Sequence, residues 1–91
     1  MKEKIPKRNE DFTLIKTEEG EIVLANIKEK YFIKTDELVI AIWLECDGKK
    51  DIDEITKSLI ENYKIDLPFD EVKESVKSII DILIREGILY Y

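Results

Sequence analysis

Few side chains in this sequence are suited to chemistry. Cys46 is the only cysteine and there is no histidine, so an intrachain disulfide is impossible and the usual zinc and Cys-His arrangements are absent. The three glycines, at positions 20, 48 and 87, lie far apart beside predicted turns and cannot form a phosphate-binding loop. We therefore expect no catalytic residue and no cofactor, and we expect Cys46 to be a small buried thiol in a helix.

A cluster of carboxylates superficially suggests a cation site. Asp47, Asp51, Asp53 and Glu54 follow one another closely, but their spacing does not match a calcium-binding EF-hand loop. Asp51 with Glu54 three residues later has instead the spacing of the capping box that starts a helix. We therefore expect no metal site here.

Lysines beside apolar residues form the more informative pattern. Lys28, Lys30 and Lys34 surround a short apolar run, and Lys73 and Lys77 lie one turn apart on a predicted helix. They stand out because the chain as a whole is acidic, with a net charge of −6. Such a surface suits an acidic, partly apolar peptide, although lysines also serve to keep an exposed edge strand from aggregating.

Length and composition bound the class of protein. A chain of 91 residues with 44% hydrophobic and 40% charged side chains suffices for one small core, so we expect a single domain over residues 1–91 with a polar lead-in segment at 1–10. The acidic balance makes a poor surface for nucleic acid. The first apolar cluster is short and interrupted by charge, so it does not read as a secretory signal, and no apolar stretch approaches the roughly 20 residues that span a membrane. We therefore expect a cytoplasmic protein without membrane contact.

Three short runs in the first part of the chain predict strands. Residues 12–17 and 22–27 are rich in β-branched and aromatic side chains, and a short connection with Gly20 joins them as in a hairpin. A second charged connection leads to residues 31–33, which we expect as a third antiparallel strand at the edge of the sheet. The pattern therefore predicts a three-stranded sheet over residues 11–34.

Helical periodicity begins after this sheet. Thr35 is a suitable N-cap for a first helix that is apolar nearly all round, from Leu38 to Cys46, and that we expect at the buried centre of the domain. The second helix begins at Asp51 and carries a stripe at helical spacing. Its inward side chains are Ile52, Ile55, Leu59 and Tyr63.

The third predicted helix is the longest and ends near Arg85, after which residues 88–91 fold back on the core. Ile82 and Ile84 lie off its inward stripe, which indicates a second packed face or an exposed binding strip. That stripe consists of Val72, Val76, Ile79, Ile80 and Leu83. The whole pattern predicts an α+β fold: a three-stranded antiparallel sheet followed by three helices at 35–91, similar to a winged helix-turn-helix.

A groove follows if the third helix packs alongside the third strand. The two elements would border an apolar floor with basic edges and unpaired strand backbone. An extended peptide adds readily to such an edge, because its main chain completes the hydrogen bonds of the sheet.

Several short motifs together resemble a known family. Pro6-Lys7-Arg8 precedes the first strand, Glu45-Cys46-Asp47-Gly48 ends the first helix, and Ile52-Asp53-Glu54-Ile55 starts the second. The PqqD-like family of RiPP recognition elements typically shows a Pro-x-Arg start, a cysteine-aspartate-glycine turn and a valine-x-glutamate-isoleucine helix start. The similarity continues through Leu59 and Tyr63, residues 70–72 and residues 83–89, so the ordered set covers nearly the whole chain.

The resemblance implies a function as well as a fold. Members of the family bind the leader region of a ribosomally made precursor peptide and present its core to a modifying enzyme, often a radical SAM enzyme. The leader adds to the third strand and lies against the third helix. The matching positions here are Lys30, Tyr31, Phe32, Ile33 and Lys34 on the strand, and Lys73, Val76, Lys77, Ile80 and Ile84 on the helix.

On this hypothesis the leader is acidic and partly apolar. Its backbone pairs with residues 31–34, it inserts side chains toward Val76 and Ile80, and three lysines orient it. These are Lys30, Lys73 and Lys77. Tethering the leader raises the effective concentration of the core at the enzyme, so this chain acts as a binding protein and not as an enzyme.

Two other functions stay open at this point. The helical trio has the size of a winged-helix DNA-binding module, although its third helix carries more carboxylates than cations. Alternatively, the domain is a structural module, and a homodimer forms when two edge strands pair with each other. An apparent molecular mass that depends on protein concentration, together with no binding of peptide, would favour the homodimer.

Overall fold

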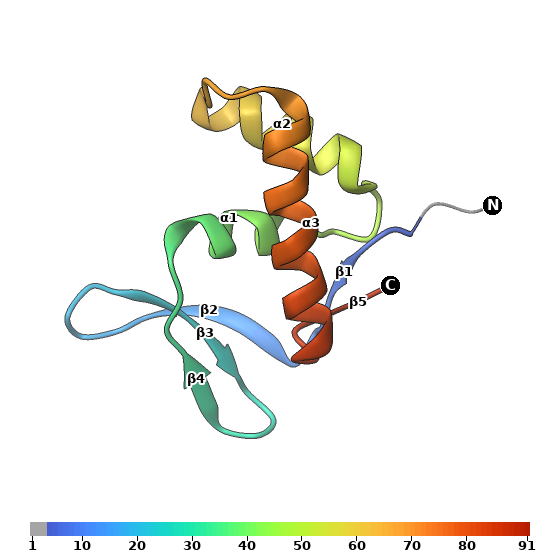
Figure 1. Cartoon of the computed structure of the whole chain (residues 1–91). Helices are drawn as coiled ribbons and strands as arrows, with labels where there is room; N and C mark the ends of the chain where they lie inside the picture. Colours follow the sequence, from blue (N-terminus) through green and yellow to red (C-terminus); the bar gives the residue numbers. More distant parts are fainter. Residues whose placement is uncertain (1–3) are drawn as a thin grey trace.

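A computed structural model describes residues 4–91 of the chain. The predicted α+β fold, with a three-stranded antiparallel sheet followed by three helices, is confirmed. Figure 1 shows α1 between this sheet and α2. In chain order, the elements within these residues are β1 (Lys7–Arg8), β2 (Phe12–Lys16), β3 (Ile22–Asn26), β4 (Tyr31–Ile33), α1 (Glu37–Glu45), α2 (Ile52–Tyr63), α3 (Phe69–Arg85) and β5 (Leu89–Tyr90).

The three-stranded sheet has the order β2-β3-β4, with β3 at its centre. Leu14, Leu24 and Ile33 stand opposite one another across the three strands. They share the face that packs on the helices, and Leu24 is completely buried there. In this sheet β4 pairs with β3 alone, so its other edge is open.

Local hydrogen bonds shift some predicted element ends by one residue. β2 ends one residue earlier than predicted, because the N–H of Thr17 already donates to the carbonyl of Glu21 at 2.8 Å in the following turn. α1 is capped by Asp36 and not, as predicted, by Thr35. The Asp36 carboxylate accepts a hydrogen bond from the Val39 N–H at 3.0 Å.

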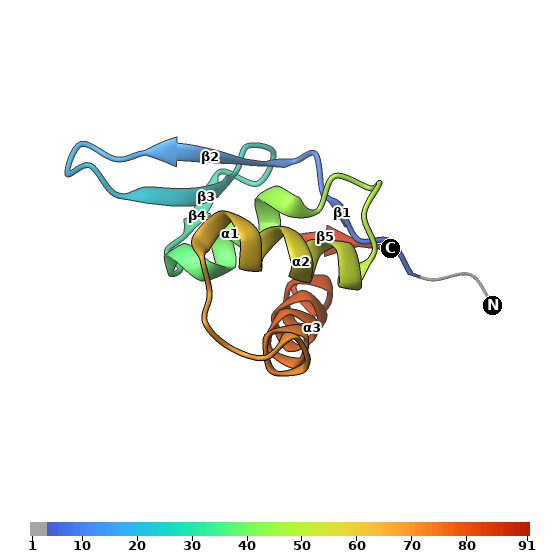
Figure 2. The same cartoon turned by 90° about the horizontal axis from the view of Figure 1, so that it is seen from above.

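Helix α1 is buried on one side only. Ala41, Ile42 and Trp43 are buried, whereas Leu38 and Leu44 are 44% and 48% exposed. The expectation of burial nearly all round is therefore wrong. α1 has 9 residues and packs on α2 and α3, which together with the sheet cover only part of its circumference. Figure 2 shows α1 between the three-stranded sheet and α3.

Helices α2 and α3 pack on each other through the stripes that their periodicity predicts. The capping box is confirmed: the Asp51 carboxylate accepts from the Glu54 N–H at 2.9 Å, and the Glu54 carboxylate accepts from the Asp51 N–H at 3.3 Å. Tyr63 was expected to face inward but is 61% exposed, because it ends α2 where the chain leaves the core. The buried stripes are Ile55 and Leu59 on α2 and Val72, Val76, Ile80 and Leu83 on α3.

The predicted lead-in segment is, from residue 6 onward, part of the fold. Lys7 and Arg8 form β1, which pairs antiparallel with β5 at the other end of the chain. Pro6 is fully buried, whereas Ile5, the residue expected to pin the segment, is 40% exposed. Residues 88–91 fold back as predicted, with Ile88 and the first residue of β5 buried.

Arg8 fastens β1 to the end of α1. Its guanidinium donates to the carbonyl of Leu44 and lies over the ring of Trp43, 5.4 Å from the centroid. The carbonyl end of a helix and the face of an indole ring both carry partial negative charge, so both favour a cation. One side chain thereby joins the first strand to the first helix.

We expect Arg8→Ala to lower the free energy of unfolding by about 1–3 kcal/mol, because it removes a charge-assisted hydrogen bond together with a cation–π contact. Urea unfolding followed by Trp43 fluorescence measures the change. Arg85→Ala removes an exposed arginine at the end of α3 and should cost less than about 0.5 kcal/mol. Similar losses in the two variants would contradict a specific role for Arg8.

Candidate functional site

The free edge of β4 is the first feature of the candidate site. Tyr31 and Phe32 are 45% and 58% exposed, and Ile33 is partly buried against the core. Successive side chains of a strand point to opposite faces, so Phe32 lies on the outer face and Tyr31 shares the inner face with Ile33. An extended peptide can hydrogen-bond along this edge without disturbing the sheet.

A shallow hollow lies between the start of α1 and the outer surface of α3. Its volume is about 660 Å³. Leu38 of α1 forms one apolar wall and Ile79 of α3 forms another. α1 follows β4 after a short connection (Figure 1). Leu38 lies in the first turn of α1, so the hollow lies near the end of β4. The full lining is Leu38, Glu74, Ser75, Lys77, Ser78, Ile79 and Asp81.

Ile82 extends this apolar surface along α3. It is 50% exposed and lies four residues after Ser78 and three after Ile79, hence on the same flank one turn further on. The sequence already distinguishes Ile82 from the core residues, because it lies off the inward stripe of the helix. Leu38 and Ile79 carry no such signal, because each fits the apolar pattern of its own helix and reads as a core residue.

The strand residues of the predicted site lie together. Lys30 precedes β4 in a turn with a positive φ of 59°, and Lys34 follows the strand directly. The Lys34 ammonium lies 3.4 Å from the Glu21 carboxylate across the sheet. Because both partners are exposed, this ion pair contributes little to stability. The free edge of β4 thus has one lysine at each end.

Two predicted helix residues do not line this surface. Val76 and Ile80 are 1% and 0% exposed and belong to the inward stripe of α3. Positions four apart share a face of a helix, and this face packs into the core together with Val72 and Leu83. A peptide cannot insert toward Val76 and Ile80 in this conformation. Their role is to hold α3 in place beneath the exposed flank.

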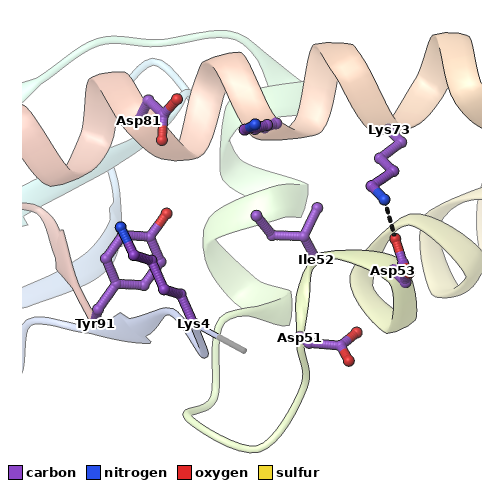
Figure 3. Close-up of a pocket in the computed structure, with 8 residues that line it drawn as sticks. Lys4, Asp51, Ile52, Asp53, Lys73, Asp81 and Tyr91 are labelled. Atoms are coloured by element: carbon purple, nitrogen blue, oxygen red, sulfur yellow. Dashed lines mark ion pairs between the residues drawn. The ribbon is translucent and has the colours of Figure 1, made fainter. Parts of the chain in front are cut away.

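Lys73 and Lys77 lie on the other flank of α3. The Lys73 ammonium pairs with the Asp53 carboxylate at 2.7 Å, so it points toward the start of α2 (Figure 3). Both lysines line a second hollow of about 490 Å³ together with Tyr91, and Lys77 also borders the hollow of Leu38. The structure therefore does not bring Lys73 to the strand lysines. Ile84 lies on the same flank as Lys77 and packs partly against the core.

Cys46 has no accessible thiol. It is completely buried at the C-cap of α1, and its Sγ donates to the carbonyl of Ile42 at 3.1 Å. Burial raises the pKa of the Cys46 thiol to about 12, and the positive charge of Arg8 only partly opposes this. A thiol that stays protonated at neutral pH is not a nucleophile. The predicted buried thiol is confirmed.

Three of the four carboxylates at positions 47–54 bind backbone N–H groups, and the fourth, Asp53, pairs with Lys73. Asp47 accepts a hydrogen bond from the Lys49 N–H at 2.9 Å, which lowers the pKa of the Asp47 carboxyl. Across residues 4–91, no three side chains of the metal-ligating types come close enough to hold an ion. Nor does any helix in that range have both the length and the apolar character to cross a membrane.

The sequence and the fold were compared with those of known proteins. The family model described as coenzyme PQQ synthesis protein D (PqqD) matches residues 21–89. Among curated protein sequences, none matches this chain. The family match therefore spans β3 to β5 and includes both the free strand and the hollow.

Two solved structures share the fold. One is described as lasso peptide synthetase B1 complexed with the leader peptide, with a TM-score of 0.72, 9% identity and coverage of 97% of this chain and 100% of the other. The second is TbiB1 in complex with the TbiA(beta) leader peptide, with a TM-score of 0.70, 16% identity and coverage of 93% and 98%. At such identities the likeness is one of fold.

We expect the Cys46 thiol to make the protein less stable as pH rises above 9. In the folded protein the thiol keeps its proton up to about pH 12, whereas an unfolded thiol loses it near the ordinary value of 9.0. Its contribution is therefore complete below pH 9 and declines above it. Urea unfolding at about pH 8 and about pH 10 measures the decline. Cys46→Ala should remove this part of the pH dependence, and an unaltered profile in that variant would contradict the assignment.

Proposed function

This chain belongs to the PqqD family, and we propose that it is a single peptide-binding domain that recognises the leader segment of a ribosomally synthesised precursor peptide. The two solved structures with the same fold each hold a leader peptide, which supports this proposal. The protein acts in the cytoplasm, where such precursors are made, and contributes recognition without chemistry of its own.

The open edge of β4 is the observation that carries this proposal. An added leader strand would pair with β4 as β3 does on the other side. Main-chain hydrogen bonds supply affinity in this mode, and pockets for alternate side chains supply specificity. An exposed strand edge promotes aggregation. The simplest explanation for the open edge of β4 is therefore that a peptide occupies it.

The hollow beside α1 receives the inward side chains of the added strand. Leu38, Ile79 and Ile82 supply apolar contact there, and the hydroxyls of Ser75 and Ser78 can pair with polar groups of the peptide. These residues replace Val76 and Ile80 in the binding surface. The lysines at the two ends of β4 lie beside the added strand and restrict its register on β4.

We further propose that a modifying enzyme, of the radical SAM type, acts on the core peptide while this domain holds the leader. Holding the leader turns the encounter between core and enzyme into an intramolecular one, with an effective concentration on the order of millimolar for a short linker. Catalytic groups then belong to the enzyme. The domain needs only to bind the leader and to leave the core peptide accessible to the modifying enzyme.

Two alternatives use the same molecule differently. Pairing of two β4 edges gives a homodimer, and this would compete with leader binding because it occupies the same backbone groups. A DNA-binding winged helix is disfavoured, because the net charge is −6 and carboxylates line the outer surface of α3.

An NMR titration of the isotopically labelled protein with the leader of a precursor encoded beside it tests the binding mode. We expect saturable shifts along Tyr31–Ile33 and at Leu38, Ile79 and Ile82. The absence of shifts in β4 would contradict strand addition. Shifts that appear on dilution alone would identify the edge-paired dimer, and shifts with duplex DNA would identify the DNA-binding alternative.

Side-chain variants test the hollow separately. We expect Leu38→Glu and Ile82→Glu each to weaken leader binding about tenfold or more, because each places a charge against a buried apolar contact of the peptide. Fluorescence anisotropy of a labelled leader measures the affinity. Leu67→Glu is the matched control, since Leu67 is 57% exposed in the connection between α2 and α3. Equal weakening by all three variants would remove the hollow from the binding site.

A further inference from the structure

The hollow beside α1 is bordered by more negative than positive charge. Glu74 and Asp81 contribute two carboxylates to its lining, and Lys77 contributes the single ammonium. Asp81 and Lys77 also border the second hollow, where Asp81 interacts with Tyr91. Glu37 adds a further exposed carboxylate next to Leu38, in the first turn of α1. An inward side chain of an added strand therefore meets apolar surface with carboxylates around it.

Two of the lysines that favoured an acidic leader, Lys73 and Lys34, are paired with carboxylates outside the hollow. The ammonium of Lys73 pairs with Asp53 at 2.7 Å on the far flank of α3. That of Lys34 pairs with Glu21 at 3.4 Å. Oppositely charged partners at these distances largely cancel each other's field at the hollow. The sequence is rich in lysine around these elements. The hollow that would receive the peptide side chains nevertheless carries no excess of positive charge.

The start of α1 does not reverse this balance. Free N–H groups at a helix N-terminus favour anions. Here the Asp36 carboxylate already accepts the Val39 N–H at 3.0 Å, and Glu37 places a second carboxylate in the first turn. The chain itself supplies the negative charge that this helix end favours, so an acidic peptide gains little there.

We propose that the leader, bound in the strand-addition mode on which this inference rests, presents an apolar side chain to Leu38 and Ile79 with lysine or arginine on the same face. Side chains two positions apart on a strand share a face and are separated by roughly 6.6 Å. That spacing carries a long basic side chain from the apolar contact to Glu74, Asp81 or Glu37. The recognised peptide is therefore apolar and basic on its inward face, not acidic.

Two synthetic peptides test the charge preference directly on the full chain. Both have leucine at a central position in the same threonine-rich background, and they differ only in lysine or glutamate two residues before and after it. We expect the lysine peptide to bind roughly fivefold tighter at low salt, as measured by NMR titration. The preference should shrink in about 0.5 M salt, because exposed charges are screened there.

A pair of double variants assigns the preference to the hollow. Glu74→Lys with Asp81→Lys should reverse it, so that the glutamate peptide becomes the tighter ligand. Glu61→Lys with Asp66→Lys makes the same change of net charge at exposed positions outside the hollow. This control should keep most of the preference for lysine, because neither residue lines the hollow.

The outcomes separate this inference from the proposed function. Equal affinities with shifts at Tyr31–Ile33 would overturn the charge preference and leave strand addition intact. Tighter binding of the glutamate peptide would overturn it in favour of an acidic leader. If neither peptide shifts β4, strand addition itself fails, and the inference fails with it.

Discussion

The burial of one side of α1 determines where the other elements of this small fold can lie. Ile42 is completely buried there, as are Leu24 from the sheet and Ile80 from α3. A closely packed interior leaves little room for displacement. Because α1 occupies the space between the sheet and α3, neither helix takes the place of a fourth strand, and within residues 4–91 only β3 pairs with β4. The open edge and the hollow beside it are two consequences of the same packing.

The same arrangement decides which flank of α3 meets which neighbour. The flank with Ser75, Ile79 and Ile82 borders the start of α1, whereas Lys73 points to the start of α2. Recognition at the edge would therefore combine main-chain pairing with apolar contact and a local excess of carboxylates. The net charge of the chain says little about this, because the sign of a surface is set by the few groups that the fold places there.

Much of the fold follows from short-range pattern, and the site follows less closely. The capping box of Asp51, the inward stripe of α3 and the hairpin of β2 and β3 each depend on residues a few positions apart, and all three were predictable. The strand residues of the predicted site lie on an open edge, whereas Val76 and Ile80 of its helix part are buried in the core. Periodicity groups Lys73 with Lys77 and Val76 with Ile80, but it does not say which group faces the strand.

By itself the sequence determined the order and type of the main elements, the identity of most core residues and the resemblance to the PqqD family. Those features rest on local hydrogen bonds and on helical and strand periods, which operate within a few residues. Only the tertiary structure decided that β1 pairs with β5, that α1 leaves Leu38 exposed, and that Lys73 turns away from β4. These depend on contacts between distant segments, whose geometry is set by the packing of the whole core and not by any one stretch of chain.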